Sequence, residues 1–216
     1  MDRFKDRGDA GRQLAAALAS RLKPETVVLG IPRGGVEVAW EVALRTGCGF
    51  SALVVRKLPY PDNPEAGFGA VAEDGTVCML PEARRDLPRG VIERILAEQK
   101  AEARRRVAVL RQGEPLPDLK GREVCLIDDG VAMGSTMLAG VLCCRNLGAA
   151  KVTAASPVAS VSARQVLTRN ADEVVVLLVP PFFRAVAEHY EDWRDVPDAE
   201  AAAFLKSRSP HPGRRA

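Results

Sequence analysis

The central segment of this chain reads Val124-Cys-Leu-Ile-Asp-Asp-Gly-Val-Ala-Met-Gly-Ser-Thr-Met137. Its first four residues are apolar, which predicts a short buried strand of a parallel sheet. Two carboxylates, Asp128 and Asp129, follow this strand, and the small residues of 130–136 then form a turn. The apolar run 137–147 is long enough for a helix. The segment therefore predicts a strand, an acidic pair, a loop and a helix in direct succession.

The same segment has the chemistry of a phosphate site. Backbone N–H groups of the loop can converge on an anion, and the helix N-terminus adds partial positive charge. The hydroxyls of Ser135 and Thr136 can donate to phosphate oxygens. Asp128 and Asp129 can accept from sugar hydroxyls or hold Mg²⁺ through water. The alternative is an ordinary strand–turn–helix unit in which the two acids only cap the helix.

Two further segments place polar groups at the ends of expected strands. Pro32-Arg-Gly-Gly35 follows the apolar run 26–31, and Arg56-Lys57 follows the apolar run 50–55. A Gly-Gly turn lets backbone amides approach a ligand closely, and the cations Arg33, Arg56 and Lys57 would attract its negative charge. The alternatives are a plain tight turn and a solvated strand end. Because ligands bind at the carboxyl ends of parallel strands, we expect all three segments to share one crevice.

The order of the expected elements predicts the fold. Apolar runs begin near residues 26, 50, 123, 151 and 173, with helical patterns at 9–22, 36–46, 88–110, 137–147, 159–168 and 199–206. Strands that alternate with helices form right-handed βαβ units. We therefore predict an α/β fold with a doubly wound, five-stranded parallel sheet.

Residues 58–75 are rich in proline and glycine, and we expect a long loop there, the kind of loop that is usually functional. Within it, residues 65–72 could enter a short hairpin with its turn at 73–75 and its return at 76–80. In the helix that follows, Arg104-Arg-Arg106 is either a solvated face or a ligand contact, and the pattern favours the solvated face.

Composition limits the class of protein. A length of 216 residues suits one α/β domain, and a net charge of +3 is too weak to argue for nucleic acid as a partner. No run of 18 apolar residues occurs, and the charged first residues lack a signal core, so we expect no membrane segment and a cytoplasmic location. The five cysteines form no CxxC pair, which indicates reduced, mostly buried residues. Residues 207–216 are expected to be disordered.

Aromatic residues gather in 182–193, and this segment is expected to cap the mouth of the crevice. One ring could instead stack on an acceptor. His189, between Glu188 and Tyr190, could be a base, but a packing or surface role is favoured.

The acidic segment resembles the phosphoribosyl pyrophosphate (PRPP) motif of the type I phosphoribosyltransferases, in which an apolar strand, two acidic residues and a small-residue loop follow one another. The chain is most similar to a bacterial and archaeal group of predicted phosphoribosyltransferases. The segments that resemble this group, besides the acidic segment, are residues 4–11, 31–35, 55–57, 64–65 and 69–70. The resemblance implies a single domain over 1–206, with a small hood formed within 58–112 and 180–206.

The resemblance also implies an activity, the transfer of the 5-phosphoribosyl group of PRPP to a small acceptor, often a nitrogenous base, with release of pyrophosphate. Mg²⁺ would be held mainly by PRPP and water near the acidic pair. A homodimer is common for this fold. The implied site residues are Asp128 and Asp129 as the catalytic pair, Ala132, Met133, Gly134, Ser135 and Thr136 for the 5′-phosphate, and Arg33, Gly34, Gly35, Arg56 and Lys57 for pyrophosphate.

This chain departs from the family pattern at two positions. Met133 stands where the family usually has a threonine that donates to the phosphate, so the alternative is a PRPP- or nucleotide-binding regulator with little or no turnover. Ala132 stands where purine-specific relatives have an aspartate, which disfavours hypoxanthine or guanine as acceptor. A phosphatase or hydrolase is a weaker alternative, because the sequence contains no cluster of metal-ligand histidines. The sequence does not identify the acceptor.

Overall fold

The structure is a computed structural model and describes residues 3–80 and 82–207, so residues 208–216 of the expected disordered tail lie outside the described part. Its larger sheet is parallel and five-stranded, in the order β2-β1-β6-β7-β8. Its strands are β1 (Val27–Gly30), β2 (Gly49–Ala52), β6 (Glu123–Ile127), β7 (Lys151–Val158) and β8 (Glu173–Leu178). This sheet confirms the predicted fold class.

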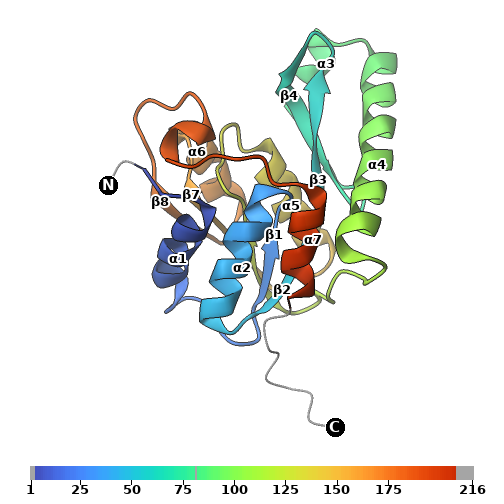
Figure 1. Ribbon diagram of the computed structural model, residues 1–216. Helices are drawn as coiled ribbons and strands as arrows, with labels where there is room; N and C mark the ends of the chain where they lie inside the picture. Colours follow the sequence, from blue (N-terminus) through green and yellow to red (C-terminus); the bar gives the residue numbers. More distant parts are fainter. Residues whose placement is uncertain (1–2, 81, 208–216) are drawn as a thin grey trace.

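Helices cover both faces of the parallel sheet (Figure 1). Val28 and Ile127 pack on one face with α1 (Arg7–Leu18) and α2 (Gly34–Thr46). Leu29 and Leu126 pack on the other face with α5 (Ser135–Asn146) and α6 (Val161–Asn170). The faces alternate along each strand because successive side chains of a strand point to opposite sides. Such two-sided burial explains why these strands appear in the sequence as continuous apolar runs.

The hood is a second unit of structure beside the parallel sheet. It contains the antiparallel sheet of β3 (Val55–Tyr60), β4 (Asn63–Ala72) and β5 (Val77–Met79), together with α3 (Ala83–Asp86) and the first part of α4 (Arg89–Arg111). Leu58 and Phe68 pack on Ile92 and Ile95 of α4. In Figure 1 the hairpin of β3 and β4 projects from the core beside α4. The C-terminal elements are η1 (Val186–His189) and α7 (Asp198–Lys206).

The prediction of a long loop at residues 58–75 is wrong. Strand β3 continues to Tyr60 and pairs with β4, because apolar residues on one face of this hairpin are buried against α4 despite the prolines. The hairpin predicted with its turn at 73–75 is confirmed and consists of β4 and β5. Gly75 has φ of +94° in its turn, and the Ala72 amide donates to the Thr76 carbonyl.

Arg56 and Lys57 are also placed differently from the prediction. They do not end a parallel strand, because β2 ends at Ala52 and the chain then turns into β3 of the hood. The apolar run 50–55 thus contains a strand of each sheet. Pro157 lies inside β7 and not at its end. It follows the last pair with β6, Ile127 with Ala155, so its missing N–H breaks no hydrogen bond to β6.

The remaining difference concerns the start of a helix, whereas the cysteines agree with the prediction. Helix α1 begins at Arg7, before the expected start at residue 9, because the Asp6 side chain accepts a hydrogen bond from the Asp9 amide at 2.6 Å. The five cysteines are free thiols, and all except Cys78 are buried. Within residues 3–80 and 82–207, no helix combines the length and apolar character needed to cross a lipid bilayer.

A buried ion pair fixes the hood to the core. Arg111, at the end of α4, donates to both carboxylate oxygens of Glu73 at 2.6 and 3.0 Å and to the Ala52 carbonyl at 3.0 Å. Glu73 also accepts from the Val54 amide at 2.8 Å. Only 7% of the Arg111 side chain and 11% of the Glu73 side chain are exposed. A charge in such a position depends on its partner, since water cannot replace it.

We predict that Glu73→Gln lowers the free energy of unfolding by about 3 kcal/mol, because it leaves the Arg111 charge buried without a counter-charge. Urea unfolding measures this change. The matched control is Glu93→Gln, which breaks an ion pair of 2.7 Å with Arg89. The side chain of Glu93 is 60% exposed and that of Arg89 is 91% exposed. This control should change the free energy by about 0.5 kcal/mol or less. Equal effects of the two substitutions would contradict the prediction.

Candidate functional site

The acidic pair lies directly against the Gly-Gly turn. The amide of Ile31, just after β1, donates to the carbonyl of Ile127, the last residue of β6, at 2.8 Å, so the two segments leave the sheet side by side. A Cβ atom on Gly34 would collide with Oδ2 of Asp129, and one on Gly35 would lie 2.8 Å from the Cα of Asp128. Only glycine allows this approach. The structure therefore brings together two of the three predicted segments at the carboxyl end of the sheet.

Asp128 and Asp129 have different surroundings. Oδ1 of Asp128 accepts a hydrogen bond from the Asp129 amide at 2.9 Å. Burial and the neighbouring charge of Asp129 raise the pKa of Asp128 well above its ordinary value. Oδ2 of Asp129 instead accepts from Nε of Arg7 at 2.7 Å.

Arg7 is a site residue that the sequence analysis did not identify as one. Its guanidinium also donates to the Arg194 carbonyl at 2.7 Å and lies 3.9 Å from the ring centroid of Trp193. Its side chain is only 6% exposed. The segment 4–11 carries part of the family resemblance, but Arg7 and Asp129 are separated by 122 positions, which no local pattern can connect.

The aromatic segment covers the acidic turn. The Tyr190 hydroxyl donates to the Asp129 carbonyl at 2.6 Å, and Val186 fills the space where a side chain on Gly130 would lie. Burial raises the pKa of Tyr190. His189 is buried and stacks on Phe183 with 5.5 Å between ring centroids, so its surroundings are those of a packing residue.

The loop that follows the acidic pair is held from the other side by α6. The hydroxyl of Ser160 donates to the Ala132 carbonyl at 2.6 Å, and its amide donates to the Val131 carbonyl at 2.9 Å. Gly134 has φ of +85° and precedes α5 with no side chain that could cap the helix. The first amides of α5 therefore remain for an anion or water. Ser135 is buried and Thr136 is half-buried, whereas Met133 is 62% exposed.

The predicted cations occupy different surroundings. Arg33 forms an ion pair with Asp195, whose side chain is 80% exposed. Arg56 donates to Gln99 of α4 at 3.2 Å, and burial, followed by repulsion from Arg106 and Arg33, lowers its pKa. Arg33 and Arg56 are thus close enough to repel.

Lys57 lies on the opposite face of β3, because neighbouring residues of a strand alternate. It shares the face of Val55, which packs toward α5, while Arg56 shares the face of Leu58, which packs toward α4. The expectation that Arg56 and Lys57 both point into one crevice is therefore wrong, because they lie on opposite faces of β3. The aliphatic part of Lys57 crosses Gly67, where a Cβ atom would lie 2.6 Å from its Cγ.

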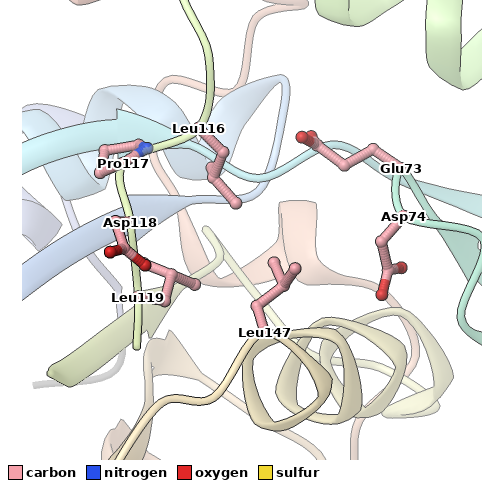
Figure 2. A pocket seen from close by; sticks show the side chains of 7 residues that line it. All are labelled: Glu73, Asp74, Leu116, Pro117, Asp118, Leu119 and Leu147. Carbon is pink, nitrogen blue, oxygen red and sulfur yellow. The ribbon is translucent and has the colours of Figure 1, made fainter. Parts of the chain in front are cut away.

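Two cavities occur elsewhere in the described part of the chain. One, of about 270 Å³, is shown in Figure 2 and is lined by Glu73, Asp74, Leu116, Pro117, Asp118, Leu119 and Leu147. It lies between the β4–β5 turn, the chain that leads into β6, and the end of α5. This position is at the opposite end of β6 from Asp128. The other, of about 480 Å³, lies in the hood and is lined by Met79, Leu87, Arg89, Ile92, Glu93 and Leu96. Neither is lined by a predicted site residue.

The acidic pair suits a hard cation with few protein ligands. Among the described residues, no group of three or more histidine, cysteine, aspartate or glutamate side chains could hold a metal ion on its own. Asp128 and Asp129 offer carboxylate oxygens, the ligands that Mg²⁺ prefers, and Mg²⁺ commonly takes its remaining ligands from water and phosphate. The donor set therefore fits Mg²⁺ that arrives with a polyphosphate.

Comparisons with known proteins agree on one family. A family model described as "Phosphoribosyl transferase domain" matches residues 3–191. A protein of Mycobacterium tuberculosis (strain ATCC 25618 / H37Rv) named "Putative phosphoribosyl transferase" is 41% identical over 207 residues, which are 95% of this chain and 47% of the relative. The chain thus spans about half the length of the curated relatives that it matches.

Solved structures show the same fold. The protein TT1426 from Thermus thermophilus is 43% identical with a TM-score of 0.80, and the match covers 95% of this chain and 98% of that one. A purine phosphoribosyltransferase from Pyrococcus horikoshii is 16% identical with a TM-score of 0.50, over 91% and 97% of the two chains. At that identity the second match shows only the shared fold.

We predict that Gly34→Ala lowers the free energy of unfolding by about 2 kcal/mol, because the added methyl group must displace Asp129 or Arg7. Urea unfolding measures the loss. Gly90→Ala is the control, since a Cβ atom on this helical glycine meets nothing within 4 Å, and alanine there should be neutral or stabilising. If Gly34→Ala were as well tolerated as Gly90→Ala, the close approach would be disproved.

A second prediction concerns pH. Because the folded-state pKa of Asp128 is raised, the native state binds more protons than the unfolded state, and stability falls as pH rises from about 4 through the folded-state pKa. Asp128→Asn keeps the acceptor for the Asp129 amide and removes the charge. It should raise the free energy of unfolding at pH 7 by about 1 kcal/mol, and the gain should shrink as pH falls toward 4.

Urea unfolding at a series of pH values provides the measurement, with Asp118→Asn as a matched control. Asp118 accepts from the Lys120 amide at the exposed, opposite end of β6. A loss of stability at pH 7 in Asp128→Asn, or a gain that does not depend on pH, would contradict the account of Asp128.

Proposed function

Since the chain belongs to the phosphoribosyl transferase family, we propose that it transfers the 5-phosphoribosyl group of PRPP to a small acceptor and releases pyrophosphate. The observation that carries this proposal is the contact between the Gly34–Gly35 turn and the Asp128–Asp129 pair. This contact puts an amide-rich turn and two carboxylates at one edge of the sheet. A sugar that carries a diphosphate needs both kinds of group within the length of one molecule.

Each part of the site has a role in this proposal. Asp128 and Asp129 accept hydrogen bonds from the ribose hydroxyls, and their charge stabilises the cationic ring of an oxocarbenium-like transition state. In the transfer, the bond from C1 to the pyrophosphate oxygen breaks and a bond from C1 to the acceptor forms. The bonding electrons leave with pyrophosphate, and the proton that the acceptor loses passes to the departing pyrophosphate or to water.

The loop of Ala132, Met133, Gly134, Ser135 and Thr136 holds the 5′-phosphate, and the open amides of α5 support this role. Gly34 and Gly35 receive pyrophosphate through the backbone, and Arg33 and Arg56, whose charges repel each other, would share its charge. Arg33 must leave Asp195 to do so. An ion pair with so exposed a partner contributes about 1 kcal/mol or less, so little free energy is lost when Arg33 leaves Asp195.

Mg²⁺ fits this proposal as a cofactor. Asp128 and Asp129 would hold it through water, beside the oxygens of PRPP. When bound, Mg²⁺ offsets negative charge on the departing pyrophosphate. The protein residues themselves bind and orient the sugar, and the proposal requires no nucleophilic serine or cysteine.

Met133 favours a second candidate function. Its side chain is 62% exposed at the loop that would bind the phosphate, and it provides no hydroxyl. A binding protein that senses PRPP or a nucleotide with the same pocket, without turnover, is therefore the alternative to an enzyme. The loss of one donor to a charged phosphate would weaken binding by about 1.5 kcal/mol.

We predict that the chain binds PRPP with Mg²⁺ in isothermal titration and that Asp129→Asn weakens this binding about tenfold or more, because a charged acceptor for a ribose hydroxyl is lost. Asp118→Asn is the control, since this aspartate lines the cavity in Figure 2 at the other end of β6. Unchanged affinity in Asp129→Asn would remove the acidic pair from the site. Weaker binding in Asp118→Asn alone would move the site to that cavity.

Pyrophosphate release over a panel of nitrogenous bases distinguishes the two candidates. An enzyme releases pyrophosphate from PRPP only when its acceptor is present. Tight binding of PRPP with no release for any base would favour the regulator.

A further inference from the structure

We propose that Arg7 is a positioning residue for the ribose site, because it holds one oxygen of Asp129 and leaves the other to read a single sugar hydroxyl. The inference rests on the proposed function, in which Asp129 contacts the ribose. Arg7 itself does not touch the substrate in this proposal. It acts through the carboxylate that it fixes.

The guanidinium of Arg7 is held on three sides. Nε donates to Oδ2 of Asp129, another nitrogen donates to the Arg194 carbonyl, and the Trp193 ring lies beneath its central carbon. A Cβ atom on Gly34 would lie 2.5 Å from Nε, so the turn closes the remaining side. A planar guanidinium held in this way has one orientation, and so does the carboxylate that it binds.

The two oxygens of Asp129 therefore differ. Oδ2 accepts from Nε of Arg7, and the neighbouring carboxyl group of Asp128 is a further hydrogen-bond partner of the Asp129 side chain. The side chain of Asp129 is 15% exposed, so a ligand can reach it. A carboxylate whose Oδ2 is held by Arg7 can present its other oxygen to one hydroxyl in a fixed position.

A purely structural ion pair in this protein has a different pattern. In the pair of Arg111 and Glu73, both glutamate oxygens accept from the arginine, and the pair joins the hood to the core. The pair of Arg7 and Asp129 is buried to a similar depth, but Arg7 binds only one of the two carboxylate oxygens. A carboxylate oxygen that the arginine does not bind is what a positioning role requires and a structural role does not.

The test compares ribose 5-phosphate with its 2-deoxy and 3-deoxy analogues in calorimetric or NMR titrations. Wild type should bind ribose 5-phosphate about tenfold more tightly than the analogue that lacks the hydroxyl read by Asp129. In Arg7→Met this preference should fall to about twofold or less, as in Asp129→Asn. Arg7→Lys should restore part of it, since an ammonium keeps the charge but not the planar fork.

Arg12→Met is the matched control on the same helix, because Arg12 is 44% exposed and pairs with Asp9 and Glu41 away from the acidic pair. It should keep the preference of wild type. Thermal unfolding of each variant shows whether it is folded. If Arg7→Met does not fold, Arg7→Lys carries the test, and its preference should still fall about threefold.

Two results overturn the inference, and they are distinguishable. A folded Arg7→Met or Arg7→Lys with the wild-type preference, or with tighter binding of ribose 5-phosphate, shows that Arg7 is structural or blocks the site, while the proposed function stands. No preference for either hydroxyl in wild type overturns the inference together with the proposed ribose site.

Discussion

The close contact between the Gly34–Gly35 turn and the Asp128–Asp129 pair is the constraint on which the site depends. It follows from sheet topology, because β1 and β6 are parallel neighbours that end at Gly30 and Ile127, which are partners in the register. Their following residues must leave the same edge of the sheet. Without side chains on the two glycines, the turn can lie against the carboxylates, so backbone amides and negative charge come within the span of one small molecule.

Segments far apart in the sequence complete this edge. The start of α1 supplies a counter-charge to Asp129, and the C-terminal segment supplies Tyr190 and the ring of Trp193. These contacts hold two adjacent carboxylates, and burial, followed by repulsion from Asp129, raises the pKa of Asp128. Charged groups kept at functional sites commonly cost stability relative to uncharged replacements.

The sequence predicted the parts whose information is local. The parallel sheet followed from five apolar runs, and the acidic segment with its loop and helix lies where its pattern indicated. The hood was less predictable, because prolines and glycines at 58–75 indicated a loop while packing against α4 produced strands. The same error put Arg56 and Lys57 on a parallel strand. Arg7 could not be assigned to the site, since only the folded chain brings it to Asp129.

The most direct test of the central claim is a crystal structure of the protein with PRPP and Mg²⁺. The account predicts the ribose hydroxyls within hydrogen-bond distance of Asp128 and Asp129, the 5′-phosphate at the amides of residues 132–136, and the diphosphate at Gly34 and Gly35. Ligand bound in the cavity between Glu73 and Leu147, with the acidic turn still covered, would contradict it.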